Sequence, residues 1–128
     1  MHFCSFGRSC RTWKICTKPW KLGTWQSSPQ EVENAVTRAI EVGYRHIDTA
    51  FAYQNEVDVG RAINKAIADG KVKREDLFVT TKLWATFADR AADGLEQSLK
   101  NLGLDYVDLY LVHWPIMMNP KGRTCSFS

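Results

Sequence analysis

Hydrophobic positions follow two alternating periods from about residue 21 to residue 115. Short runs of apolar and β-branched residues predict strands at 21–26, 44–48, 77–84 and 107–115. Between them, apolar residues recur three and four positions apart, which predicts helices at 27–43, 56–70 and 89–103. The chain therefore alternates strand and helix, beginning and ending with a strand.

The first predicted helix has the clearest boundaries. Ser28 and Glu31 have the spacing of a capping box, Pro29 stands at the first helical position, and Gly43 follows the last turn. The expected buried faces of the three helices are, in order, Val32, Val36, Ala39 and Ile40; Val59, Ile63, Ala66 and Ile67; and Ala92, Leu95, Leu99 and Leu102.

Strict alternation of strands and helices favours right-handed crossovers and a parallel sheet. A doubly wound sheet would be expected to carry a glycine-rich phosphate loop after its first strand, but the turn GTWQSSP has a single glycine. A barrel is therefore favoured. Because a closed barrel needs about 250 residues, we expect an α/β fold of the (β/α)8 TIM-barrel type, truncated to about the first four βα units.

The expected domain lies at residues 21–120. Residues 1–20 read as a divergent leader without structure of its own, and an organelle transit peptide is a less favoured alternative. The segment from residue 116 shows no periodicity, so we interpret it as a frayed tail, with residues 121–128 outside the domain.

Composition and charge narrow the function classes. Apolar residues make up 45% of the chain and charged residues 24%, which is typical of a globular domain. The net charge of +3 arises before residue 22, because the first five basic residues precede the first acid, Glu31. This pattern disfavours nucleic-acid binding. No apolar run is long enough for a membrane span or a secretory signal, so we expect a cytoplasmic protein.

Four cysteines lie outside the patterned segment, at Cys4, Cys10, Cys16 and Cys125. Their spacing fits neither a C-x-x-C redox pair nor a usual zinc motif. We expect incidental thiols and no metal site.

Polar residues follow three consecutive predicted strands. Asp48, Lys82 and His113 recur at intervals of about one βα unit, and Tyr53 lies in the loop after Asp48. Each alone could be a turn cap, a surface lysine, a core histidine or a pocket filler. Because the carboxyl ends of barrel strands meet at one rim, we interpret the four together as a site.

This set of side chains indicates proton transfer. A lysine cation beside a tyrosine stabilises the phenolate, so Tyr53 could donate a proton near neutral pH, and Asp48 would keep Lys82 charged. His113 would orient the substrate oxygen. Three aromatic residues near strand ends could wall an apolar pocket or simply fill the core: Trp25, Trp84 and Trp114.

The segment from residue 22 to about residue 120 resembles the N-terminal part of the aldo-keto reductases. The motifs that carry the resemblance are LGTW, GYRHIDTAFAYQNE, KREDLFVTTKLW and SLKNLGLDYVDLYLVHWP, all in family order. They span roughly three quarters of the chain and about the first 40% of a family barrel. The similarity is greatest to aldehyde and glycerol-type reductases.

The resemblance implies an oxidoreductase that reduces an aldehyde or ketone to an alcohol with NADPH. The family is usually monomeric, and its small-molecule substrates include aldehydes, ketones and polyols. The implied catalytic residues are Tyr53 as proton donor, with Lys82, Asp48 and His113. Implied cofactor-binding residues are Gly23, Thr24, Trp25 and Asp48. Implied substrate-binding residues are Trp25, Tyr53, Trp84, His113 and Trp114.

Other interpretations remain open at this point. Four strands leave two open sheet edges, which predicts self-association and weak or no turnover for this chain. The chain could be a non-catalytic half barrel that acts as an interaction module, or the product of an incomplete gene model. A metal-dependent barrel hydrolase built on His46, Asp48, Lys82 and His113 is least favoured, because such enzymes usually have more histidines.

Overall fold

The main sheet of the protein has four parallel strands in chain order. The computed structural model describes residues 20–118 and 124–125. Its strands are β1 (Lys21–Gly23), β2 (His46–Asp48), β3 (Phe78–Leu83) and β4 (Leu109–Val112), in the order β1-β2-β3-β4. This arrangement confirms the alternating α/β pattern. All four strands are shorter than predicted, because backbone pairing covers only part of each apolar run.

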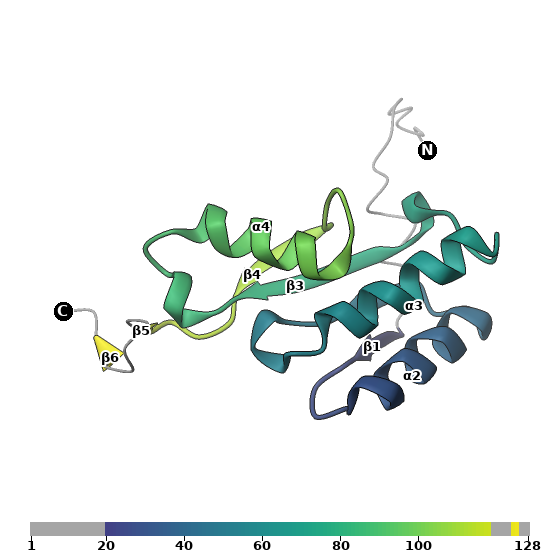
Figure 1. The fold of residues 1–128 in the computed structure, drawn as a ribbon, viewed down its shortest axis with the longest axis horizontal. Helices are drawn as coiled ribbons and strands as arrows, with labels where there is room; N and C mark the ends of the chain where they lie inside the picture. Colours follow the sequence, from purple (N-terminus) through teal and green to yellow (C-terminus); the bar gives the residue numbers. More distant parts are fainter. Residues whose placement is uncertain (1–19, 119–123, 126–128) are drawn as a thin grey trace, which may run out of the picture.

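Three helices lie along one face of this sheet (Figure 1). They are α2 (Pro29–Glu41), α3 (Glu56–Ala68) and α4 (Ala91–Leu102). Short 3-10 helices η1 (Phe51–Tyr53), η2 (Arg74–Asp76) and η3 (Ala85–Phe87) lie in the connections, where the sequence pattern gave no signal. The core lies between the helices and the sheet, with Ile47 and Val79 fully buried in it. The opposite face of the sheet carries the polar side chains described below.

Helix α2 begins as its sequence predicts. The Ser28 backbone N–H donates to Glu31 Oε2 at 3.0 Å, and the Glu31 backbone N–H donates to Ser28 Oγ at 3.4 Å, so the capping box is complete. The predicted apolar face is confirmed, since Val32, Val36, Ala39 and Ile40 are all buried.

The predicted buried face of α4 is wrong for three of its four positions. Ala92 is exposed, and Leu95 and Leu99 are half-buried. The buried positions are instead Gly94, Ser98 and Leu102. A methyl group at Gly94 would lie 3.0 Å from Leu83, Phe87 and Tyr110 atoms. Small residues allow α4 to lie close to the sheet, and an apolar period does not detect them.

The segment after residue 115 also differs from the prediction. Strand β5 (Met117–Met118) pairs in antiparallel fashion with β6 (Thr124–Cys125), so these residues are not a frayed tail. Two-residue strands are too short to produce a detectable period. Residues 1–19 of the predicted leader 1–20 lie outside the described residues, and Cys4, Cys10 and Cys16 are among them.

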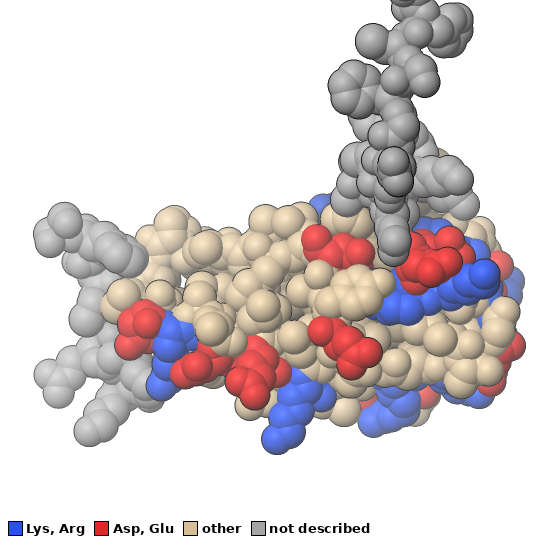
Figure 2. All heavy atoms as spheres, turned by 90° about the horizontal axis from the view of Figure 1, so that it is seen from above, with Lys and Arg blue, Asp and Glu red and all other residues tan. Residues whose placement is uncertain are grey.

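Strand β4 is much more exposed than an inner barrel strand. Leu109, Leu111 and Val112 are 39%, 41% and 67% exposed, and among the described residues the strand pairs only with β3. Within the described part of the chain, no helix is long and apolar enough to cross a membrane. On the face in Figure 2, acidic and basic side chains are intermingled. This face therefore shows no stripe of a single charge sign.

The crossing of α3 over α4 gives a test of the packing. A methyl group on Gly60 would lie 2.2 Å from the backbone oxygen of Leu102, so Gly60→Ala must push the helices apart. We expect Gly60→Ala to lower the free energy of unfolding by about 2 kcal/mol in urea denaturation. Gly23→Ala is the control, because a methyl group there meets nothing within 4 Å. Equal stability of the two variants would contradict this packing.

Candidate active site

Parallel register brings the predicted site residues to one edge of the sheet. Asp48 pairs with Gly23 of β1 and with Thr80 of β3, and Lys82 of β3 pairs with Leu111 of β4. The His113 backbone N–H then donates to the Leu83 carbonyl at 3.1 Å, directly after β4. The spacing of one βα unit in the sequence therefore becomes proximity in space.

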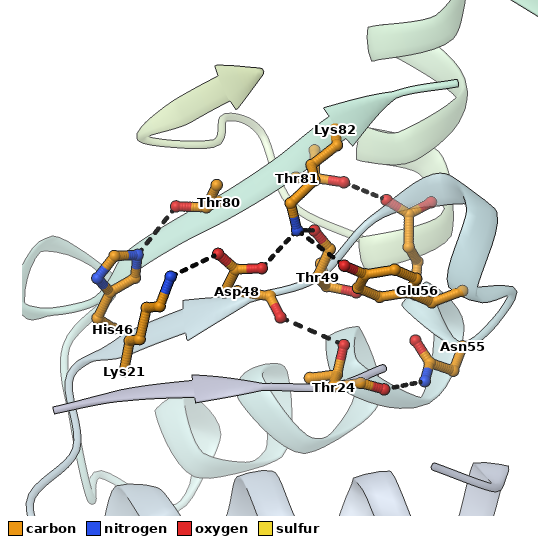
Figure 3. A network of polar contacts seen from close by, with 11 residues as sticks. Lys21, Thr24, His46, Asp48, Thr49, Asn55, Glu56, Thr80, Thr81 and Lys82 are labelled. Atoms are coloured by element: carbon orange, nitrogen blue, oxygen red, sulfur yellow. Dashed lines mark hydrogen bonds and ion pairs between the residues drawn. The ribbon is translucent and has the colours of Figure 1, made fainter. Parts of the chain in front are cut away.

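Lys82 is the centre of the site. Its side chain is 14% exposed, and its ammonium donates to Asp48 Oδ1, to the Thr49 carbonyl at 2.9 Å and to Tyr53 Oη at 3.2 Å. Figure 3 shows the ammonium between Asp48 and Thr49. An ammonium has three N–H donors, so each donor has one acceptor. This confirms the predicted proximity of Asp48, Tyr53 and Lys82.

Asp48 lies between two cations. One oxygen accepts from Lys82, and the other lies 3.7 Å from the ammonium of Lys21 on β1. Lys21 is 64% exposed, so water screens this second pair strongly, and its contribution is small. Lys82 is therefore the principal partner of Asp48.

The loop after β2 places Tyr53 over Lys82. Its 3-10 helix η1 is closed by the Tyr53 N–H donating to the Ala50 carbonyl at 3.0 Å. Gln54 follows in the left-handed region with φ of 56°, which reverses the chain before α3. The Lys82 ammonium lies 4.9 Å from the centroid of the Tyr53 ring. The phenol is thus held by the turn and by the cation.

His113 packs among aromatic rings. Its ring lies edge-on to Tyr53 at 5.4 Å and to Trp84 at 5.5 Å, and stacks on Trp114 at 6.1 Å between centroids. Burial lowers the pKa of His113 below its usual value, and the nearby charge of Lys82 lowers it further. The imidazole is consequently neutral at neutral pH. Its Nδ1 atom is buried without a hydrogen-bond partner among the described residues.

An apolar cavity of about 140 Å³ lies among the residues at the ends of β3 and β4, and its lining does not include Asp48, Tyr53, Lys82 or His113. Trp84 and Trp114 are among its lining residues, and Trp25 is not. Trp25 is 67% exposed on the turn after β1. The remaining lining residues are Leu83, Ala85, Ala88, Val112, Pro115 and Ile116.

The turn after β1 lies against Asp48. Thr24 is 1% exposed and its N–H donates to the Asp48 carbonyl at 3.1 Å, with its Oγ1 at 3.4 Å from the same oxygen. Thr24 therefore fixes the turn and presents little surface to a ligand. A methyl group at Gly23 would meet nothing within 4 Å, so the backbone there faces open space. Gly23 and Trp25 are the accessible members of the predicted cofactor-binding set.

Two buried polar residues near the site escaped the sequence analysis. Asn55 donates to the Thr24 carbonyl at 2.8 Å. Glu56 accepts from Thr81 Oγ1 at 2.7 Å and from Asn101 at 2.9 Å. A signal for Glu56 was present, because helical spacing puts position 56 on the buried face of α3 with Ile63. No comparable signal marked Asn55.

No group of three or more histidine, cysteine, aspartate or glutamate residues that could hold a metal ion occurs within residues 20–118 and 124–125. The predicted site residues that meet in the structure are Asp48, Tyr53, Lys82 and His113, with Trp84 and Trp114 beside them.

The profile of the aldo/keto reductase family matches residues 14–127. The D-galacturonate reductase of Hypocrea jecorina is 55% identical over 106 residues, which are 83% of this chain and 34% of that protein. The glycerol 2-dehydrogenase (NADP(+)) of Saccharomyces cerevisiae is 56% identical over 99 residues, which are 77% of this chain and 30% of that protein. The chain thus spans about one third of the length of these relatives.

Solved structures agree with this match. The aldo-keto reductase of Bombyx mori in complex with NADP superposes with a TM-score of 0.79 at 50% identity, covering 84% of this chain and 38% of that one. The aldose reductase of Schistosoma japonicum gives a TM-score of 0.76 at 43% identity, with 84% and 40% covered. The four-stranded sheet is therefore part of a TIM-barrel fold, as the sequence predicted.

The environment of His113 can be tested by titration. Removing the cation in Lys82→Met should raise the pKa of His113 in the folded protein, because the repulsion disappears and Asp48 loses its partner. Proton NMR of the imidazole in the wild type and the variant measures this shift. Lys65→Met is the control, since Lys65 pairs with Asp69 on the exposed side of α3. A His113 titration that is unchanged in Lys82→Met would contradict the assignment.

The same shift fixes the sign of one pH effect on stability. The folded state binds the His113 proton less tightly than the unfolded chain, whose pKa is near 6.5. The contribution of His113 to the free energy of unfolding is therefore fully present above pH 6.5, and it is lost as the pH falls through the folded-state pKa of His113.

Proposed function

Because the chain belongs to the aldo/keto reductase family, we propose that its site reduces an aldehyde or ketone to the corresponding alcohol with NADPH. The observation that carries the proposal is the Lys82 ammonium, which is hydrogen-bonded to both Tyr53 Oη and Asp48. In this arrangement a phenol is joined to a cation that is itself held by a carboxylate. Such a group can deliver a proton to a carbonyl oxygen.

We assign the proton donation to Tyr53. As the phenol gives up its proton, negative charge develops on Tyr53 Oη, and the Lys82 ammonium 3.2 Å away stabilises that charge. Asp48 and the Thr49 carbonyl hold the ammonium in place, so no reorganisation is needed at that moment. NADPH, when bound, supplies the hydride that this chemistry requires.

His113 completes the proposed proton-transfer site. Its neutral ring packs edge-on against Tyr53, so a substrate oxygen approaching the phenol also meets the imidazole. Trp84 and Trp114 pack against His113, and in this proposal their rings contact the substituent of the carbonyl. Substrate binding by Trp25 is a separate part of the proposal, because Trp25 is exposed on the turn after β1.

The residues beside Asp48 fit one end of a dinucleotide. Gly23 offers open space above its backbone, and Trp25 offers an exposed aromatic face on the same turn. We propose that this turn contacts the nicotinamide half of NADPH, with Thr24 fixing the turn from below.

The substrate class is proposed from the relatives. Their names give a uronate reductase, a glycerol dehydrogenase and an aldose reductase, which all concern polyols or their carbonyl forms. We therefore propose a small aldehyde, ketone or polyol as substrate. The predicted cytoplasmic location stays a prediction.

The function can be tested in a chimera, because the chain spans only part of its relatives. Residues 20–118 would replace the matching segment of the Saccharomyces cerevisiae glycerol 2-dehydrogenase, which is 56% identical over 99 residues. Oxidation of NADPH with glyceraldehyde measures turnover. We expect Tyr53→Phe to lower kcat by about 100-fold or more, because the variant cannot donate the proton.

The matched control for this experiment is Tyr106→Phe. Tyr106 packs its ring on Arg74 of η2, which precedes β3, whereas Lys82 lies near the opposite end of β3. Phenylalanine preserves the ring of Tyr106. A chimera with a Tyr53→Phe rate equal to that of the unmodified chimera would refute the role of Tyr53.

A second candidate function has one observation in its favour. The edge of β4 is exposed and apolar, so the 128-residue chain presents a surface that another strand could cover. We propose that the chain associates with itself through this edge, and it could act as an interaction module in that state. A discrete dimer without affinity for NADPH would favour this function over reduction.

Self-association has its own test. Leu109→Lys places a charge on β4, which among the described residues pairs only with β3 and in which Leu109 is 39% exposed. We expect this variant to shift the chain towards monomer in analytical ultracentrifugation. Val42→Lys is the control, because Val42 is 59% exposed at the end of α2, away from the edge. A monomeric wild-type chain, or the same mass for both variants, would argue against association through β4.

A further inference from the structure

Asn55 precedes α3 but does not cap it. Asparagine is one of the preferred N-cap residues, because its side chain can accept from the first free N–H groups of a helix. Here the Asn55 side chain makes no capping hydrogen bond to α3. It is 2% exposed, so it is not directed to solvent either. A buried polar side chain that forgoes its local partner must be held by another element.

The other element is the turn after β1. The Asn55 amide nitrogen donates to the Thr24 carbonyl at 2.8 Å and lies 3.4 Å from the Ser27 carbonyl. Figure 3 shows the Asn55 amide directed at Thr24. Thr24 in turn donates to the Asp48 carbonyl. Asn55 thus joins the loop that carries Tyr53 to the turn that carries Gly23 and Trp25.

Both joined segments contain a strained residue. Gln26 and Gln54 have φ values of 60° and 56°, and they are the only residues other than glycine with positive φ within the described ranges. One lies on the turn after β1, and the other lies between Tyr53 and Asn55. Such conformations persist where the surrounding structure holds them. Asn55 belongs to the segment of Gln54, and its hydrogen bonds to Thr24 and Ser27 join this segment to the segment of Gln26.

The neighbouring residue anchors the same loop on its other side. Glu56 is 1% exposed and accepts from Thr81, the residue before Lys82 on β3. Its second oxygen accepts from Asn101 of α4. Glu56 therefore fixes the loop to β3, and the hydrogen bonds of Asn55 fix the position of the loop relative to the turn after β1.

We propose that Asn55 is a positioning residue that holds the turn of Gly23, Thr24 and Trp25 at a fixed place beside Tyr53. The proposal rests on the proposed function, in which that turn contacts the nicotinamide and Tyr53 donates the proton. Asn55 itself contacts neither substrate nor cofactor. Asn55 thereby couples the turn that contacts the nicotinamide, which is the source of the hydride, to the loop that carries Tyr53, which is the proton donor.

Two substitutions remove the link and leave a favoured N-cap residue type in front of α3. Asn55→Asp has nearly the same size but no hydrogen-bond donor. Its carboxylate oxygens would face the carbonyl oxygens of Thr24 and Ser27 and repel them. Asn55→Ser is too short to reach them. Aspartate and serine are both favoured N-cap residues, so α3 itself need not be weakened by either change.

The matched control is Asn64→Ser. Asn64 also lies on α3, and its amide also donates to two backbone carbonyls, those of Leu102 at 3.0 Å and Gly103 at 3.2 Å. It links α3 to α4 and does not contact the turn. Asn64→Ser therefore loses an equivalent pair of hydrogen bonds without the proposed coupling.

The first measurement is amide hydrogen exchange by NMR on the full chain. In Asn55→Asp and Asn55→Ser we expect the Thr24 amide, which donates to Asp48, to exchange about tenfold faster. The core amides of Val36 and Ile63 should be unchanged, which separates a local effect from loss of stability. Unchanged Thr24 exchange in both variants would overturn the proposal, and so would an equal increase in Asn64→Ser.

The second measurement is binding of NADPH, followed by the fluorescence of the cofactor. We expect both Asn55 variants to bind at least about tenfold more weakly, and Asn64→Ser to bind as the wild type does. Wild-type affinity in the Asn55 variants would overturn the coupling. If the wild-type chain binds no NADPH, the proposed function fails, while the exchange of Thr24 still decides whether Asn55 fixes the turn.

Discussion

The site is organised by the ammonium of Lys82, whose side chain is only 14% exposed. A buried cation is tolerated only where its charge and its three donors are satisfied. Asp48, the Thr49 carbonyl and Tyr53 satisfy them, and all three come from β2 and the segment directly after it. The pairing of β2 with β3 must therefore be in the observed register, because a shift of one residue would turn Lys82 or Asp48 to the helix side of the sheet.

The same constraint explains why a polar layer lies on one face of a sheet. Alternation along the strands sends Ile47 and Val79 into the helix-covered core, and sends Asp48, Thr80 and Lys82 to the opposite face. On β4 this opposite face carries Leu109 and Leu111, paired in register with Thr80 and Lys82. The apolar side chain of Leu111 beside Lys82 lowers the access of water to the ammonium. The strand order thus places the apolar strand β4 next to the polar site on β3.

The sequence was most informative where local chemistry and tertiary structure agree. The capping box of Ser28 and Glu31, and the polar residues that end β2 and β3, are each visible within a few positions of the chain. It was least informative where packing depends on small residues or distant carbonyls. The Gly94 and Ser98 face of α4 carries no large apolar residue, so periodicity pointed to Leu95 and Leu99 instead. The pairing of β5 with β6 is settled by backbone contacts, which leave no period in two residues.

Asn55 shows why some positioning residues escape sequence reasoning. A polar residue before a helix has an adequate local explanation, namely capping, and that explanation is wrong here. The actual partners lie 31 and 28 positions away, on a turn whose buried Thr24 carbonyl accepts from the Asn55 side chain. The need for that donor arises only once Thr24 is packed against Asp48. A site that joins several loops therefore creates its own requirements for buried polar groups, and these follow from the assembled fold rather than from any one segment.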